Sequence, residues 1–162
     1  MIDENPDKML LQRKGFGWGL KCAEVAPGVD IGRDVVLNRG LSGVDLERVE
    51  GMANLAQALT MAFTTGLGMD VFNVRFGFDG IRVLAEESNP IMARERIRVS
   101  AIQILQKDPR IRRILEVRLP EGDTEAERVS QRMLRELHVA VSFETITFEQ
   151  VSLNLGKVMP YV

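Results

Sequence analysis

Few side chains in this chain have the types and spacing that catalysis needs. His138 is the single histidine and Cys22 the single cysteine. His138 shares one side of an alternating run with Ser142, which is typical of a solvent-facing strand, and no sequence signature of a general base surrounds it. Cys22 falls on the same predicted face as Phe16 and Trp18, so an inert buried thiol is favoured over a nucleophile.

Paired carboxylates would be the acid and base of a glycosidase. Candidates are Glu86 with Glu87 and Glu125 with Glu127, but sequence does not give the separation of two carboxylates across a substrate. One cysteine rules out a cysteine-built zinc site, and one histidine leaves no imidazole cluster. The sequence therefore predicts no catalytic residue, no metal ligand set and no cofactor site.

The densest chemical signal is a group of arginines on both sides of an Asp-Pro-Arg corner. Guanidinium groups bind carboxylates in a bidentate geometry, and arginine is enriched at protein interfaces. The alternative is a solvated face with ion pairs along a helix. The sequence leaves both interpretations open for the six members of this arginine cluster, which are Arg94, Arg96, Arg98, Arg110, Arg112 and Arg113.

Length and composition are those of one soluble domain. A chain of 162 residues buries about 70% of its unfolded surface. Its net charge is −2, with 21 basic and 23 acidic residues interspersed, so we expect no nucleic-acid partner. No apolar run is long enough for a bilayer, and the acidic start is unlike a signal peptide. We expect no membrane association and folding in a reducing cytoplasm.

Hydrophobic periodicity predicts the elements of the N-terminal half. Residues 1–12 read as a flexible or partner-ordered tail, and the glycine-rich run 15–25 alternates as a half-buried strand. A helix is predicted over 41–65, with Ser42 and Asp45 resembling a capping box and Gly51 allowing two helical pieces. Further predictions are a short strand at 35–38, an extended segment at 70–80 and a short helix at 81–88.

The C-terminal half carries sharper signals. Asn89 and Pro90 begin a second long helix that runs to about Gln106 and ends at Asp108-Pro109. The following strand is predicted to bury Ile111, Leu115, Val117 and Leu119. A short helix is predicted at 126–134. Residues 137–144 and 150–155 then alternate as strands, and the change of parity at Ile146 and Phe148 means a bulge, a bend or a turn between them.

These elements predict a small single α+β domain in which two main helices pack on a mixed β-sheet. The Asp108, Pro109 and Arg110 corner would fold the second helix back on its strand, burying Ile97, Ile104 and Leu105. The C-terminal ribbon would remain available for strand addition, and a self-contained hairpin is the alternative.

Five segments in this order resemble the baseplate wedge, or sheath-initiator, family of contractile phage tails. They are "NLAQAL", "TTGLG", "VRFGFD", "ARERIRVSAIQILQKDPRI" and "ILEVRL". The family is also labelled lysozyme-like, and relatives occur in tailocins and type VI secretion baseplates. The likeness covers about residues 45–155 and is sharpest over 94–119. It implies a wedge domain at residues 41–162, and residues 1–40 would be a tail and strands that contact partners.

The resemblance implies a virion protein of the tail baseplate, assembled in the host cytoplasm, with several copies in a ring. Its partners would be the tail sheath protein, baseplate wedge proteins and tail tube or hub proteins. Arg75, Phe76, Arg94 and Arg98 would contact the wedge core bundle, although Asn73 and Val74 depart from the charged signature expected there. The side chains expected on the sheath-facing strands are Val139, Val141, Phe143, Val151, Leu153 and Leu155.

Three functions are open at this point. The first is a non-enzymatic structural subunit that nucleates sheath assembly by donating β-strands to the first sheath ring. The second is a peptidoglycan-cleaving glycosidase, a tail lysozyme, and the third is a cytosolic adaptor on the same fold. Since no residue pattern here supports glycan hydrolysis, we expect the structural subunit and no enzymatic activity.

Overall fold

The computed structural model describes residues 6–24, 33–40, 43–120 and 137–158. The fold is α+β, as predicted, with helices and small antiparallel sheets. The chain forms two compact units, residues 1–58 and residues 59–162, and helix α2 (Gly51–Thr64) crosses the boundary. Within the described residues, the helices are too short or too polar to cross a membrane.

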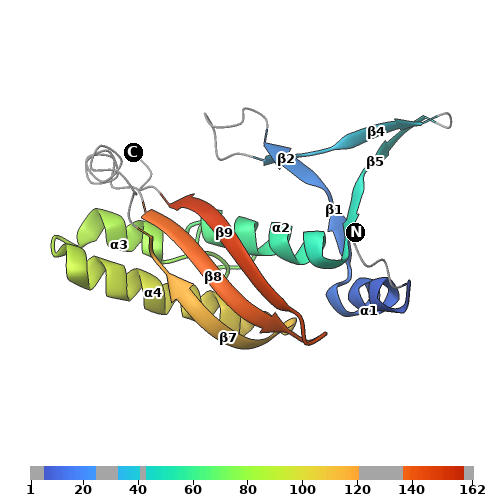
Figure 1. The fold of residues 1–162 in the computed structure, drawn as a ribbon. Helices are drawn as coiled ribbons and strands as arrows, with labels where there is room; N and C mark the ends of the chain where they lie inside the picture. The colour runs from blue at the N-terminus through green and yellow to red at the C-terminus, as the bar shows by residue number, and fades with distance from the viewer. Residues whose placement is uncertain (1–5, 25–32, 41–42, 121–136, 159–162) are drawn as a thin grey trace. The chain divides into compact units, whose positions relative to one another are not determined.

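Among its described residues, the first unit contains α1, the first part of α2 and three two-stranded antiparallel ribbons (Figure 1). The ribbons pair β1 with β6, β2 with β3, and β4 with β5. Their bounds are α1 (Pro6–Phe16), β1 (Trp18–Leu20), β2 (Cys22–Glu24), β3 (Arg33–Val35), β4 (Leu37–Gly40), β5 (Gly43–Leu46) and β6 (Arg48–Glu50).

The three ribbons meet at a triangle of backbone hydrogen bonds. The Lys21 N–H donates to the Glu47 carbonyl at 2.8 Å, Glu47 N–H to Val36 at 2.9 Å, and Val36 N–H to Lys21 at 2.9 Å. An ion pair of 2.6 Å joins Lys21 Nζ to Glu47 Oε1 across the same point. Backbone hydrogen bonds therefore connect the three ribbons to one another at this three-way junction.

The start of α2 secures the first of these ribbons. Gln57 Nε2 donates to the Leu20 carbonyl at 2.8 Å, while its Oε1 accepts from the Cys22 N–H at 2.9 Å. Gly19 faces this helix, and a Cβ there would lie 2.7 Å from Asn54 Oδ1. The glycine in this strand lets a helix side chain approach closely.

Three predictions fail in part in this unit. The strand predicted over 15–25 begins only at Trp18, because Gly15 and Phe16 belong to α1. Residues 6–12 are not a tail, because α1 includes them. The helix predicted over 41–65 begins only at Gly51, whose φ is +63°, and residues 43–50 form β5 and β6. Val44 and Leu46 alternate with polar neighbours at period two, which favours a strand over a helix. Ser42 lies outside the described residues.

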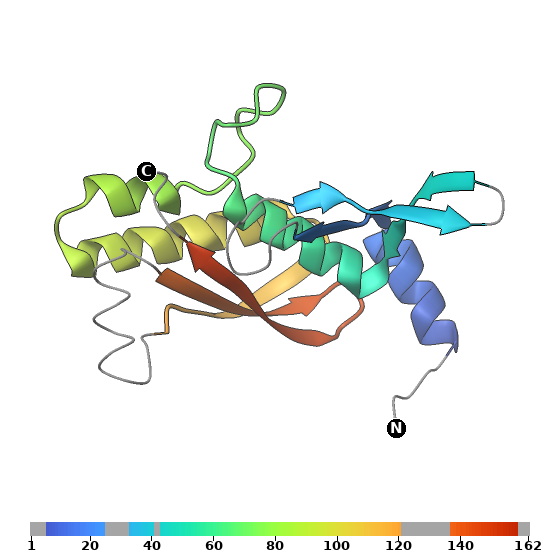
Figure 2. The ribbon, with the colours of Figure 1, turned by 90° about the horizontal axis from the view of Figure 1, so that it is seen from above.

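The second unit packs helices α3 (Gly80–Glu86) and α4 (Pro90–Lys107) with a three-stranded sheet. The strands are β7 (Ile111–Arg118), β8 (Leu137–Thr145) and β9 (Gln150–Val158), in the order β7-β8-β9. Figures 1 and 2 show α4 running beside the sheet. Asn89 caps α4 as predicted, with its side chain accepting from the N–H groups of Ile91 and Met92.

Both long helices and the sheet contribute side chains to the core. The Phe63 and Phe78 rings lie 5.0 Å apart between centroids. Full burial of each large apolar side chain contributes about 1.5–3 kcal/mol. The most deeply buried apolar side chains of the unit are Leu59, Phe63, Phe78, Val83, Ile97, Ala101, Leu105, Val139, Val141 and Phe143.

The prediction of a mixed sheet is wrong for the described strands, because β7 pairs with β8, and β8 with β9, in antiparallel fashion. Leu115 is also misassigned. Two bulges, between Ile111 and Arg113 and between Ile114 and Glu116, each add a residue to β7. Each bulge reverses the facing of the residues after it. Ile114 therefore takes an inner position, and Leu115 is 41% exposed.

Residues 65–79 form a compact loop instead of the predicted extended segment. Its ends meet at a bridge between Gly66 and Phe78. Gly77 has a φ of +107°, and a Cβ there would lie 2.6 Å from the Gly66 carbonyl oxygen. Only glycine fits this crossing. The helix predicted at 126–134 lies outside the described residues.

Candidate functional site: the sheet edges and the arginine cluster

The C-terminal strands β8 and β9 form a hairpin, and β8 is the interior strand of the three-stranded sheet. β7 pairs with one side of β8 and β9 with the other, which places β9 at an edge of the described sheet. The hairpin turns over residues 146–149, where Thr145 N–H donates to the Glu149 carbonyl at 2.9 Å and Phe148 has a φ of +63°. The sequence left a bulge, a bend or a turn open at Ile146 and Phe148, and the structure has a turn there.

The six predicted sheath-facing side chains point into their own unit. Val139, Val141 and Phe143 are at most 1% exposed. On β9, Leu155 is buried, and Val151 and Leu153 are half-buried. The opposite face of β9 presents exposed polar groups such as Ser152. Contact of β9 with another chain therefore depends on its backbone edge.

Half of the arginine cluster stabilises the fold locally. Arg94 Nη2 donates to the Leu119 carbonyl and so connects α4 to the end of β7. Arg96 pairs with Glu87 at 3.3 Å. Arg110 binds Asp108 with two side-chain hydrogen bonds, 2.8 Å from Nε to Oδ1 and 2.6 Å from Nη2 to Oδ2.

The corner owes its geometry to Asp108. Its N–H donates to the Leu105 carbonyl, and its carboxylate also accepts from the Arg110 backbone N–H at 3.0 Å. Burial raises the pKa of Asp108, but the hydrogen bonds and charge of Arg110 outweigh burial, so the pKa lies below its usual value. The carboxylate is the form that holds the corner.

The other three arginines are more available to a partner. Arg112 and Arg113 share one buried carboxylate, that of Glu144, with Arg113 Nη2 at 3.3 Å. Arg112 also lies over the Phe148 ring, 4.4 Å from its centroid. Arg98 pairs with the exposed Glu95 at 2.5 Å. Two guanidinium groups on one carboxylate leave a local excess of positive charge.

The four predicted wedge-contact residues do not form one site. Arg75 and Phe76 lie in the 65–79 loop, where Lys107 Nζ donates to the Arg75 carbonyl at 3.4 Å. Lys107 ends α4, and Arg94 and Arg98 precede it on that helix by about 20 and 14 Å along the axis. The loop and the first half of α4 are therefore separate candidate surfaces.

Sequence reasoning missed the exposed apolar face of this loop. Asp70 Oδ1 accepts from the N–H groups of Phe72 and Asn73 and so fixes the turn. Phe72 is fully exposed. The signal that marks it is the set of glycines at 66, 68, 77 and 80, which bound a loop more readily than a strand. The exposed apolar side chains are Leu67, Met69, Val71, Phe72 and Val74.

The residues considered for chemistry are dispersed. His138 is half-buried in β8 opposite Lys157, and Cys22 is a free thiol in β2. Glu125 and Glu127 lie outside the described residues. Across the part of the chain that the structure describes, no cluster of histidine, cysteine and acidic side chains is suited to a metal ion.

No protein-family model matches this sequence, and no curated protein matches it. The likeness to contractile-tail baseplate proteins therefore rests on the five sequence segments between residues 45 and 155. The sheet edges, the arginine cluster and the 65–79 loop are the candidate interaction surfaces that the structure describes.

Proposed function

We propose that this chain is a structural subunit of a contractile-tail baseplate that nucleates the sheath. In this proposal β9 pairs with a strand of the first sheath ring and extends the sheet β7-β8-β9. The chain itself catalyses nothing. Wedge proteins, and tube or hub proteins, hold it at the base of the tail, in several copies arranged as a ring.

The position of β9 carries the proposal. An edge strand presents unpaired main-chain groups that another chain can use, and proteins normally protect such edges. β9 spans nine residues and has polar groups such as Ser152 on its outer face. A partner strand would gain affinity from main-chain hydrogen bonds. β8 has no such edge, because both of its sides are paired.

The core beneath the sheet supports a nucleating role. Val139, Val141 and Phe143 fix β8 in the core, and β8 in turn fixes the register of β9. An edge held in one position binds a partner strand with a smaller loss of conformational entropy. The Asp108 corner adds to this rigidity by tying α4 to β7.

Proline substitutions along β9 test the proposal. Proline is placed in turn at Val151, Ser152 and Leu153, because successive residues send their N–H groups to opposite edges of a strand. A proline that removes an N–H directed toward β8 weakens the pairing of β9 with β8, and this variant melts at lower temperature. A proline that removes an N–H directed away from β8 leaves the melting temperature unchanged, and this variant fails to seed sheath.

Alanine at the same positions is the matched control, since it keeps the N–H. Melting is followed by circular dichroism. Seeding is measured as the number and length of sheaths formed by the sheath protein of the same genome, seen by electron microscopy. Normal sheaths on a folded variant that lacks an outward N–H would remove the proposed role of β9.

The proposed wedge contact is tested at Arg75. This side chain is exposed beside the apolar residues of the 65–79 loop. Arg75→Glu reverses its charge, and we expect weaker co-purification with the wedge proteins. Arg82→Glu on α3 is the control, and equal co-purification of both variants would count against the contact.

A further inference from the structure

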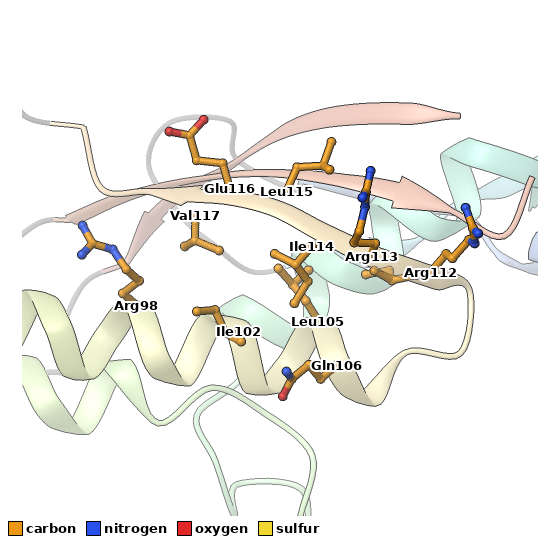
Figure 3. Close-up of a pocket in the computed structure, with 11 residues that line it drawn as sticks. Arg98, Ile102, Leu105, Gln106, Arg112, Arg113, Ile114, Leu115, Glu116 and Val117 are labelled. Carbon is orange, nitrogen blue, oxygen red and sulfur yellow. The ribbon is translucent and has the colours of Figure 1, made fainter. Parts of the chain in front are cut away.

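A groove of about 500 Å³ lies between α4 and β7, at the sheet edge opposite β9 (Figure 3). It belongs entirely to the second unit. α4 and β7 share its lining, which consists of Arg98, Ile102, Leu105 and Gln106 from the helix and residues 111–117 from the strand.

The side chains of β7 lie on two different sides of this groove. Figure 3 shows Ile114 and Val117 pointing toward α4, where Ile102 and Leu105 complete an apolar floor. Arg113 and Leu115 point away from the helix, toward the outer face of the sheet. The two bulges produce this separation by turning Arg113 and Leu115 outward.

The outer side of the groove carries more positive than negative charge, because Glu116, which also lines it, is paired with Arg118 at 2.7 Å. The Arg112 and Arg113 side chains are 53% and 65% exposed, and Glu144 is the carboxylate that they share. Arg98 stands at the other end of the groove, near Val117 (Figure 3). A guanidinium has five N–H donors, so each can bind a further carboxylate beyond its present partner.

An extended chain lying along β7 would send successive side chains to opposite sides. Alternate residues would contact the apolar floor, and those between them would meet the outer arginines. The groove thus complements a strand of alternating aliphatic and acidic residues. Because the bulges interrupt the regular spacing of β7, side-chain contacts would contribute more of the specificity than a continuous hydrogen-bond ladder.

We infer that the α4–β7 groove binds an extended segment of another protein in which aliphatic and acidic side chains alternate. Ile102, Ile114 and Val117, which are half-buried, contact the aliphatic side chains above the fully buried Leu105. Arg98, Arg112 and Arg113 bind the carboxylates. This site lies at the other edge of the sheet and does not depend on the role proposed for β9.

Titration of the full chain with a defined peptide tests the inference. The probe is a fluorescent peptide of about ten residues, long enough to span β7, in which valine and glutamate alternate. We expect saturable binding by fluorescence anisotropy, with the largest amide shifts in two-dimensional NMR at Ile102 and residues 111–117. A glutamine–valine peptide should bind at least about tenfold more weakly, because it lacks the charge-assisted hydrogen bonds.

Protein variants then locate the contacts. Replacing both arginines, Arg98→Gln with Arg113→Gln, should weaken binding about tenfold, since each exposed charge pair contributes up to about a fivefold effect. Arg82→Gln, on α3 and outside the groove, should leave the affinity unchanged. Both arginines are on the surface, and circular dichroism confirms that the variants are folded.

Several results would overturn the inference. These are an absence of binding, amide shifts centred on β9, equal binding by the double variant, or equal binding of a glutamate–serine peptide. Tighter binding of an oligonucleotide of equal charge would reassign the arginines to nucleic acid. Self-association that the double variant abolishes, seen by sedimentation, would assign the groove to a second copy.

Discussion

The two units of this chain use β-strands in opposite ways. In residues 59–162 the three strands share one sheet, and Val139, Val141 and Phe143 are buried in a common core. In residues 1–58 the strands form three separate ribbons, which expose Trp18, Leu37 and other apolar side chains. The ribbons are held together mainly by backbone hydrogen bonds at one junction.

This difference shows that alternation alone does not tell where a strand buries its side chains. A two-stranded ribbon has too few neighbours to exclude water from either face. A third strand and the helices, as in the second unit, cover one face and bury the side chains of the central strand on that face. The stability of the second unit should therefore depend on side chains, and that of the first on its junction and its contacts with α2.

Phe143→Ala should have the largest effect and break the second unit. The side chain is fully buried in the central strand, so its loss leaves a cavity and should cost about 3–5 kcal/mol. Val44→Ala in the exposed β5 should cost about 0.5 kcal/mol or less. Urea unfolding followed by far-ultraviolet circular dichroism measures both, and similar losses would mean that the two units do not differ in this way.

The bulges in β7 are tested by comparing neighbouring residues. Ile114→Ala removes an inner side chain and should cost about 1–3 kcal/mol. Leu115→Ala, at an exposed position, should cost about 0.5 kcal/mol or less. A regular strand without bulges would give the reverse order in the same unfolding measurement.

Asp108 makes the stability of the second unit depend on pH. Its pKa is lowered in the folded chain, so its contribution is present above the unfolded pKa of about 3.9 and is lost as pH falls through the folded pKa. Asp108→Asn should cost about 1–2 kcal/mol at pH 7. The difference from the unsubstituted chain should shrink in urea titrations below about pH 4, and a constant difference would contradict this origin.

The smallest expected effect concerns the junction of the first unit. Glu47→Gln removes the ion pair with Lys21 but leaves the three backbone hydrogen bonds intact. Both side chains are partly exposed, so the loss should be about 0.2–1 kcal/mol. The single tryptophan, Trp18, lies in this unit, and its fluorescence during urea unfolding reports the change. A loss above about 2 kcal/mol would mean that the ion pair, not the backbone, holds the junction.

The sequence predicted best where local chemistry decides the structure. The Asn89 cap, the proline that begins α4 and the two C-terminal strands are all present. Residues 43–50 were misread because Ser42 and Asp45 resemble a capping box, and only the pairing with β4 and β1 identifies these residues as strands. Leu115 was misplaced because a bulge changes facing without a local sequence mark.

The candidate site was predicted in its residue types more than in its geometry. The arginine cluster was identified, but its division into fold-stabilising and more available members depends on contacts across the fold. The roles of β8 and β9 also depend on contacts across the fold. The two strands alternate equally well in the sequence, and β9 rather than β8 lies at an edge because β7 pairs with β8.

Amide hydrogen exchange along β8 and β9 tests most directly whether another chain completes this sheet. In the isolated protein, we expect protection of every paired amide of β8 and fast exchange at alternate amides of β9, those that point away from β8. Addition of the sheath protein should slow exchange at these β9 amides alone. If β9 is already protected throughout and stays unchanged when the sheath protein is added, its edge is not the nucleating surface.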